Sequence, residues 1–424
     1  MAVTTPSDPA ATAMTTNGPV AHLRWFVMAL FFTFGGITSL NDVLIPKLKH
    51  LFTLSYGEAM LIQSAFFLAY LLISLPAGML VQRIGYMRSA VAGLLTMTAG
   101  CLLFLPASQS GLFITFLAAL FVLASGITIV QVVANPLISA LGNPATASSR
   151  LTFAQAFNSL GTTVFPYVGA MLILGNLAKI DQAGLVDAAV RAAEARVIDR
   201  TYVGIALALT IVAGVVWLFR NRLVEARQPV TNPLKSFDLL KRPRFAIGTV
   251  ALFLYVGAEV AIGSLMTNYL MQADTLALPA QSAGERLALY WGGAMIGRFI
   301  GAELLRRFPP ANVLLSVAVG AITLIAISTA STGHLSGYTL LMVGLMNAIM
   351  FPTIFSLASE GLGIRAAEGS GIICMAIVGG AVIPPLTGLV ADETTLRMAL
   401  IVPVICYAGI MAFARYCRTH PVIS

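Results

Sequence analysis

Charged side chains are scarce in this sequence of 424 residues. Lys, Arg, Asp and Glu together supply 10% of the residues, whereas hydrophobic residues supply 58%. A soluble domain with so few charges would have too little polar surface to stay dissolved. The mean hydropathy of +0.89 therefore indicates that most of the chain lies in a lipid bilayer.

Cysteine and histidine are also rare, with four of each. The cysteines lie inside or at the ends of apolar stretches, without paired spacing, at Cys101, Cys374, Cys406 and Cys417. The histidines lie near segment ends or in the tails, at His22, His50, His334 and His420. We therefore expect neither a disulfide nor a metal site. Because a nucleophile–base constellation, a Gly-rich phosphate loop and a signalling domain are also lacking, we expect no enzyme, no sugar sensor and no cofactor.

No cleavable export signal is expected at the amino terminus. Residues 1–21 are rich in Thr, Ala and Pro and lack the basic start and apolar run that such a signal needs. We predict a disordered cytoplasmic tail there. The net charge of +8 would suggest nucleic-acid binding in a soluble protein. Cytoplasmic loops of membrane proteins gather Lys and Arg, however, so we expect no nucleic-acid partner.

Apolar runs bounded by charge, Gly or Pro are abundant. A helix needs about 20 apolar residues to cross a bilayer, and the sequence has room for twelve such runs. They occupy residues 23–48, 57–80, 87–106, 111–141, 151–174, 200–219, 245–271, 283–305, 311–330, 335–360, 367–390 and 395–415. Residues 178–199 mix charges of both signs and predict a solvated external loop or a short helix. The predicted fold class is an all-α membrane protein with twelve transmembrane helices.

Residues 220–244 form the most charged stretch of the chain. They separate six apolar runs from six others, so we predict a cytoplasmic linker between an amino-terminal lobe, 22–219, and a carboxyl-terminal lobe, 245–418. Basic residues gather in the segments that are cytoplasmic if both termini lie inside. We expect a monomeric multi-pass protein in the inner membrane of a bacterium.

Three short patterns of the first half recur about 220 residues later, each in the corresponding helix. They are Gly78 and Arg83 with Gly301 and Arg306, Gln131 and Pro136 with Asn347 and Pro352, and Gly161, Pro166 and Gly169 with Gly380, Pro385 and Gly388. Together they predict two pseudo-symmetric, parallel six-helix repeats related by an axis along the membrane normal. We assign gating or structural roles to Gly78, Arg83, Arg298, Gly301 and Arg306.

Two carboxylates lie where hydrocarbon should reject them, at Asp42 and Glu259. A charge near the bilayer centre costs about 3 kcal/mol on insertion scales, so it must face a cavity or a partner. Asp42 could instead cap the end of its helix, because Lys47 and Lys49 follow. Glu259 lies about fourteen residues into its run, which at about 1.5 Å per residue is close to the midplane. It could instead form a structural ion pair with Arg298.

Amide side chains recur in the same apolar runs. Neutral amides offer both donors and acceptors, which is the chemistry that a sugar hydroxyl requires. Such amides also join helices in membranes, which is the alternative for any one of them. Sugars further stack on aromatic rings, although most aromatic residues in a membrane protein serve packing. The predicted substrate-binding residues are Asn41, Gln63, Gln131, Asn135, Gln155, Asn158, Glu259, Asn268, Trp291 and Asn347.

Several motifs occur together in a characteristic order. They are Asn41-Asp42 with Pro46, Ile62-Gln63-Ser64-Ala65-Phe66, Pro76-Ala77-Gly78, Ala134-Asn135-Pro136, Ala154-Gln155-Ala156-Phe157-Asn158-Ser159, Tyr255-Val256-Gly257-Ala258-Glu259, Gly297-Arg298 and Phe351-Pro352-Thr353-Ile354-Phe355-Ser356. From about Phe31 to the last helix, the chain resembles the fucose/glucose/galactose symporters of the major facilitator superfamily.

The resemblance implies a rocking carrier with a sugar site between its lobes. It implies that Asp42 takes part in coupling to a cation, H⁺ or Na⁺, and that Asn158 and neighbouring amides bind sugar. The L-fucose transporters carry a glutamate where this chain has Gln131 and a glutamine where it has Glu259. This exchange resembles the glucose/galactose branch and leaves open whether Glu259 binds the sugar or the cation. L-fucose and N-acetylglucosamine remain alternative substrates, and a drug or metabolite exporter of the same fold remains an alternative function.

Overall fold

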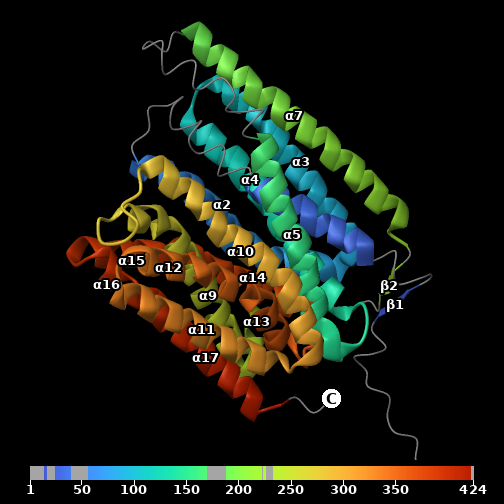
Figure 1. The fold of residues 1–424 in the computed structure, drawn as a ribbon. Coiled ribbons are helices and arrows are strands. Elements are labelled where there is room, and N and C mark those ends of the chain that lie inside the picture. Colours follow the sequence, from blue (N-terminus) through green and yellow to red (C-terminus); the bar gives the residue numbers. More distant parts are fainter. Residues whose placement is uncertain are drawn as a thin grey trace, which may run out of the picture. The chain divides into compact units, whose positions relative to one another are not determined.

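The computed structural model describes residues 14–16, 24–39, 56–169, 188–221, 223–225 and 233–421. Asn41 and Asp42 lie outside these residues, as does the side chain of Gln63. Apart from one short pair of strands, the described secondary structure is helical (Figure 1). The strands β1 (Met14–Thr16) and β2 (Leu223–Glu225) pair antiparallel.

Within the described residues, six helical segments precede residue 220 and six follow residue 242. The first six are a helix over residues 24–39, α2 (Tyr56–Ile84), α3 (Tyr86–Ser110), α4 (Phe113–Ala140), α5 (Ala147–Gly169) and α7 (Ala188–Phe219). The last six are α9 (Pro243–Met271), α10 (Ala280–Arg307), α11 (Pro310–Ala330), α12 with α13 (Gly333–Asn347, Met350–Ser359), α14 with α15 (Ala366–Met375, Gly379–Glu393), and α16 with α17 (Leu396–Ala399, Ile401–Thr419). The predicted fold class of twelve helices is confirmed.

Short elements connect these helices. They are α8 (Pro233–Ser236) and the 3-10 helices η1 (Pro144–Thr146), η3 (Phe237–Lys241), η4 (Gly363–Arg365) and η5 (Ala376–Val378). Among the described residues, nine helices are long and apolar enough to cross a membrane. α5 and α10 have the necessary length but are more polar, and they carry Gln155, Asn158 and Arg298. The more polar helices are therefore among those that hold predicted functional side chains.

The sixth helix begins earlier than the apolar run that predicted it. Residues 188–199, predicted as a loop or a short helix, are continuous with the apolar part of α7. This part of the chain is rich in Ala and also contains Arg and Glu, all of which have high helix propensity, so the helix extends beyond its apolar segment. Charge content therefore marked the end of the membrane-spanning part but not the end of the helix.

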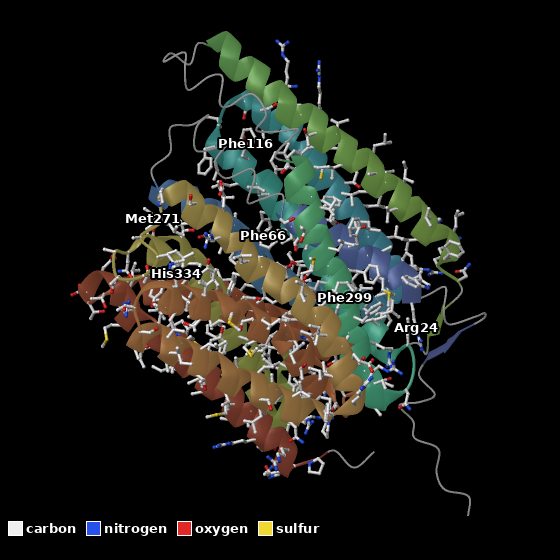
Figure 2. All side chains as sticks on the ribbon, viewed as in Figure 1. Arg24, Phe66, Phe116, Met271, Phe299 and His334 are labelled. Atoms are coloured by element: carbon white, nitrogen blue, oxygen red, sulfur yellow. The ribbon has the colours of Figure 1, made fainter. Side chains whose placement is uncertain are left out.

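The described chain forms two compact units. Of the described residues, the amino-terminal unit contains those before Ile138 and those from Phe157 to Glu225, and the carboxyl-terminal unit contains those from Pro233 onward together with Ile138–Ala156. The end of α4 and the beginning of α5 thus pack on second-half helices. The Ser149 hydroxyl donates to the Ala302 carbonyl at 2.6 Å, and the ring of Phe153 meets that of Phe299, labelled in Figure 2, at 6.2 Å.

Arginine side chains anchor the connections of the carboxyl-terminal unit. Arg365 donates to both carboxylate oxygens of Asp238 at 2.6 and 3.2 Å, which lowers the pKa of Asp238 below its ordinary value. Arg244 donates to the Leu357 carbonyl at 2.8 Å and pairs with Glu360. The carbonyls at the end of α13 and the 3-10 helix η3 of the predicted linker are therefore held by charged partners.

Glycine allows α9 and α15 to approach closely. A Cβ added at Gly379 would lie 2.0 Å from the Phe253 carbonyl oxygen, and one added at Gly257 would lie 2.2 Å from the Ile383 side chain. Small residues at such positions let helix backbones pack against one another in membranes. The contact between these two helices thus depends on the absence of side chains.

We expect Gly379→Ala to destabilise the protein by about 1–3 kcal/mol, because the added methyl group meets backbone that cannot move aside cheaply. The melting temperature of the detergent-solubilised protein should fall accordingly. Gly204→Ala is the matched control, since a Cβ at Gly204 in α7 meets no atom within 4 Å. The control should melt at the wild-type temperature or slightly above it. Equal melting temperatures for the two variants would contradict the close approach.

Candidate functional site

The middle of α9 carries Glu259. Tyr255 lies four residues earlier, and at this spacing two side chains share one face of a helix. The Tyr255 hydroxyl donates to Glu259 Oε1 at 2.8 Å. Tyr255 is completely buried and Glu259 is half-buried. The sequence Tyr255-Val256-Gly257-Ala258-Glu259 therefore supplies a carboxylate together with a fixed hydrogen-bond donor.

Asn347, at the end of α12, joins this carboxylate through tyrosines. Its amide nitrogen donates to the Tyr290 hydroxyl at 2.8 Å, and its amide oxygen accepts from the Tyr407 hydroxyl at 2.7 Å. The hydroxyls of Tyr255 and Tyr290 also donate to the carbonyls of Asn347 and Glu259, at 3.1 and 3.2 Å respectively. Four helices, α9, α10, α12 and α17, thus contribute to one hydrogen-bonded group, the Glu259 cluster: Glu259, Tyr255, Tyr290, Asn347 and Tyr407.

Arg298 on α10 brings a positive charge to this region. Its guanidinium donates to the carbonyls of Ala348 and Gln155, each at 3.2 Å. The charge of Arg298 acts on Glu259. The predicted neighbours Glu259 and Arg298 are therefore within electrostatic range of each other, while Arg298 hydrogen-bonds to backbone.

A break interrupts the predicted tenth helix beside the cluster. α12 ends at Asn347 and α13 begins at Met350, with a turn at residues 348–349 between them. The apolar run predicted over 335–360 corresponds to one candidate membrane span, Gly333–Ser359, which contains this turn. Pro352 removes one hydrogen bond at this break, because proline has no N–H to donate to the carbonyl four residues earlier, which belongs to Ala348.

The amino-terminal unit holds another tyrosine–amide pair. The Tyr70 hydroxyl on α2 donates to Gln131 Oε1 on α4 at 2.8 Å. Asn135, one turn further along α4, is completely buried. The Asn158 amide donates to the Phe31 carbonyl at 3.3 Å and so contacts the helix over residues 24–39. Three amides that the sequence assigned to substrate binding, from α4 and α5, thus lie in one unit.

The other predicted substrate residues occupy different positions. Gln155 is buried and belongs to the carboxyl-terminal unit. Asn268 is exposed near the end of α9. Trp291 is 46% exposed, and its ring meets that of Tyr290 edge-on at 5.0 Å. Trp291 therefore contacts the Glu259 cluster through Tyr290, whereas no contact described for Asn268 joins it to the cluster.

The predicted gating and structural residues fall into two groups. Gly301 is buried, and a Cβ there would lie 2.0 Å from Ile349 at the helix break. Gly78 is also buried. Arg83 is exposed, and Arg306 is exposed with Glu303 at 3.3 Å. The glycines therefore occupy packed positions, while these arginines lie at helix ends.

Sequence reasoning missed Tyr407. A tyrosine in an apolar run carries a hydroxyl that needs a partner once it is buried, and this requirement was the available signal. The halves also share an arrangement that only the structure reveals. In each half, a tyrosine on the second helix holds an amide on the fourth: Tyr70 with Gln131, and Tyr290 with Asn347.

The chemistry that these groups offer is hydrogen bonding and proton exchange. Glu259 can bind and release a proton, and the surrounding hydroxyls and amides can donate and accept hydrogen bonds. In the described ranges, no group of three or more His, Cys, Asp or Glu side chains is placed to hold a metal ion. Protonation of Glu259 is one change of charge that these groups can undergo.

Comparison with known proteins agrees with this architecture. The Major Facilitator Superfamily model matches residues 26–384. A glucose/galactose transporter of Brucella abortus (strain 2308) is 46% identical over 381 residues, which is 90% of this chain and 90% of the relative. An L-fucose-proton symporter of Escherichia coli (strain K12) is 32% identical over 406 residues, covering 92% of this chain and 91% of the relative.

A solved structure has the same fold. The crystal structure of the Major Facilitator Superfamily transporter FucP in the outward conformation superimposes with a TM-score of 0.84, at 31% identity, and the match covers 94% of this chain and 99% of that chain. The chain is therefore a member of the Major Facilitator Superfamily and, within it, of the group that contains the glucose/galactose transporters and the L-fucose-proton symporters.

Proposed function

We propose that the protein is a cation-coupled symporter that imports a hexose such as glucose or galactose by alternating access. One observation carries the proposal: a carboxylate in the middle of a transmembrane helix, Glu259, is held by Tyr255 in a buried polar cluster. An intramembrane carboxylate of this kind is a functional group by default, because its insertion is costly. The 46% identity to a glucose/galactose transporter supports the choice of substrate.

The sugar is bound by amides and by Glu259. Ionised carboxylates and amides make strong hydrogen bonds to neutral hydroxyls. We assign direct contact to Glu259, Gln131, Asn135, Gln155 and Asn158, with Asn41, Gln63, Asn268 and Trp291 as further candidates. Asn347 acts differently, because both ends of its amide are already bonded to tyrosines. Asn347 affects sugar binding indirectly, because it orients Tyr290 and Tyr407.

The coupling ion is a proton that binds Asp42 or Glu259. A proton needs only one carboxylate, and neutralising a carboxylate removes the cost of enclosing its charge when the site closes. The relative named as an L-fucose-proton symporter supports H⁺ over Na⁺. We place the protein as a monomer in a bacterial inner membrane, with both termini cytoplasmic and with 22–219 and 245–418 as the two moving lobes.

The direct test is uptake of labelled sugars into proteoliposomes under an imposed proton or sodium gradient. We expect glucose and galactose to accumulate when the proton gradient is imposed, and L-fucose and N-acetylglucosamine to compete weakly. Accumulation under the sodium gradient alone would show that the coupling ion is Na⁺ and not H⁺. If none of the four sugars is taken up and hydrophobic cations are exported, the protein is an exporter and not a symporter.

Asp42→Asn should abolish accumulation of sugar against its gradient, because an amide cannot take up the coupling proton. Sugar counterflow should continue, since exchange needs no net proton movement, and the KM for counterflow should stay within about 3-fold of wild type. Asp392→Asn, at an exposed carboxylate near the end of α15, is the matched control and should accumulate sugar normally. Undiminished accumulation by Asp42→Asn would remove Asp42 from the coupling mechanism.

Glu259→Gln should instead raise the KM for counterflow about 10-fold or more, because a charge-assisted hydrogen bond to a sugar hydroxyl is worth about 1.5–3 kcal/mol. The amide keeps the size of the carboxylate and can still accept from Tyr255, so the variant should fold. Glu393→Gln, at an exposed position on α15, is the control for removal of a glutamate charge. An unchanged KM in Glu259→Gln would show that Glu259 does not contact the sugar.

A further inference from the structure

The break between α12 and α13 leaves two backbone carbonyls that are bonded by side chains. One is the Asn347 carbonyl at the end of α12, which accepts from the Tyr255 hydroxyl at 3.1 Å. The other is the Ala348 carbonyl, which accepts from Arg298 Nε at 3.2 Å. In an apolar environment each carbonyl needs such a partner, because an unsatisfied backbone group costs several kcal/mol. Tyr255 and Arg298 therefore supply what the interrupted helix cannot.

Pro352 accounts for one of these carbonyls. A residue with an N–H at this position would donate to the Ala348 carbonyl, and proline cannot. The next residue, Thr353, donates its N–H to the Ile349 carbonyl at 3.1 Å, so regular bonding resumes one residue later. Arg298 thus occupies the position of a single missing helix hydrogen bond.

Tyr255 has one proton to donate and two acceptors for it. Its hydroxyl lies 2.8 Å from Glu259 Oε1 and 3.1 Å from the Asn347 carbonyl oxygen. A charged acceptor competes more strongly for a donor than a neutral one does. When Glu259 is ionised, the proton of Tyr255 is drawn to the carboxylate, and when Glu259 is protonated, it becomes available to the Asn347 carbonyl.

We propose that Tyr255 is a positioning residue that links the protonation of Glu259 to the break at residues 348–349, and that Arg298 holds the other side of the break in place of the bond removed by Pro352. Protonation of Glu259 strengthens the hydrogen bond from Tyr255 to the Asn347 carbonyl and so stabilises the turn at residues 348–349. Ionisation of Glu259 weakens this bond and destabilises the turn. The groups that act on Glu259 from the neighbouring elements are Arg298 and Tyr290 of α10, Tyr407 of α17 and Tyr255 of α9 itself. The inference rests on the proposed function for its role in transport.

The chain contains an internal control for this inference. Pro136 is the counterpart of Pro352 in the repeat, yet α4 is continuous from Phe113 to Ala140. The amide near it, Gln131, accepts from Tyr70. No carboxylate is among the described residues of α4. The segment 131–137 should therefore not respond to the titration of Glu259.

Hydrogen–deuterium exchange of the full-length protein in detergent tests the proposal without any substrate. After correction for intrinsic exchange rates, protection of residues 348–353 in wild type should fall about 5- to 10-fold from the acidic to the alkaline end of the pH range in which the protein stays folded, which corresponds to the loss of one hydrogen bond. Tyr255→Phe and Glu259→Gln should abolish this dependence, and Glu259→Gln should keep the high protection of the acidic wild type. Residues 131–137 should not change.

Two results would overturn the link through Tyr255. One is wild-type protection at residues 348–353 that does not vary with pH. The other is a pH dependence that persists in Tyr255→Phe. Melting temperatures of the variants show whether each variant is folded. If Tyr255→Phe does not fold, Glu259→Gln is used in its place, and a pH dependence of protection that persists in Glu259→Gln would also contradict the proposal.

The role of Arg298 is tested by a double-mutant cycle with Pro352→Ala, which restores an N–H for the Ala348 carbonyl. Arg298→Gln should lower protection of residues 348–353 about 10-fold in the wild-type background and less than about 2-fold in the Pro352→Ala background. Equal effects in both backgrounds would overturn this role. If the exchange experiment gives the expected pattern but no sugar is taken up, only the proposed function is wrong. If sugar is taken up normally but the exchange pattern is not seen, only this inference is wrong.

Discussion

Polar groups in the apolar interior of this protein must find their partners within the protein. Lipid offers no hydrogen bonds, so every buried carboxylate, amide and freed carbonyl must be matched by a neighbouring donor or acceptor. Glu259, Asn347 and the carbonyls at the helix break meet this requirement through three tyrosines and one arginine. These pairings join α9, α10, α12 and α17 within the carboxyl-terminal unit.

The internal repeat shows how one pattern can serve two purposes. Both halves place a proline five residues after an amide and hold that amide with a tyrosine from the second helix of the half. In the first half the helix remains continuous, whereas in the second half it is broken at residues 348–349. The second half also places a carboxylate and Arg298 near the break. The two halves therefore share a scaffold but differ in the continuity of the helix that carries the proline.

The location of Glu259 connects this scaffold to transport. A charge enclosed in a dry site is expensive, and binding a proton or a sugar hydroxyl lowers that expense. A carrier built in this way favours the loaded state for conformational change, which is the physical basis of symport. The similarity to glucose/galactose transporters and to L-fucose-proton symporters is consistent with a carboxylate in this role.

The sequence alone determined the membrane environment, the twelve helices and the internal repeat, and it proposed site residues that stay predictions. It could do so because apolar runs of helical length and isolated polar residues within them are local properties of the chain. It did not determine the extent of α7, the break before Pro352, or the pairing of Glu259 and Asn347 through Tyr255 and Tyr290. Those features depend on which side chains from distant segments come within hydrogen-bonding distance, and only tertiary packing decides that.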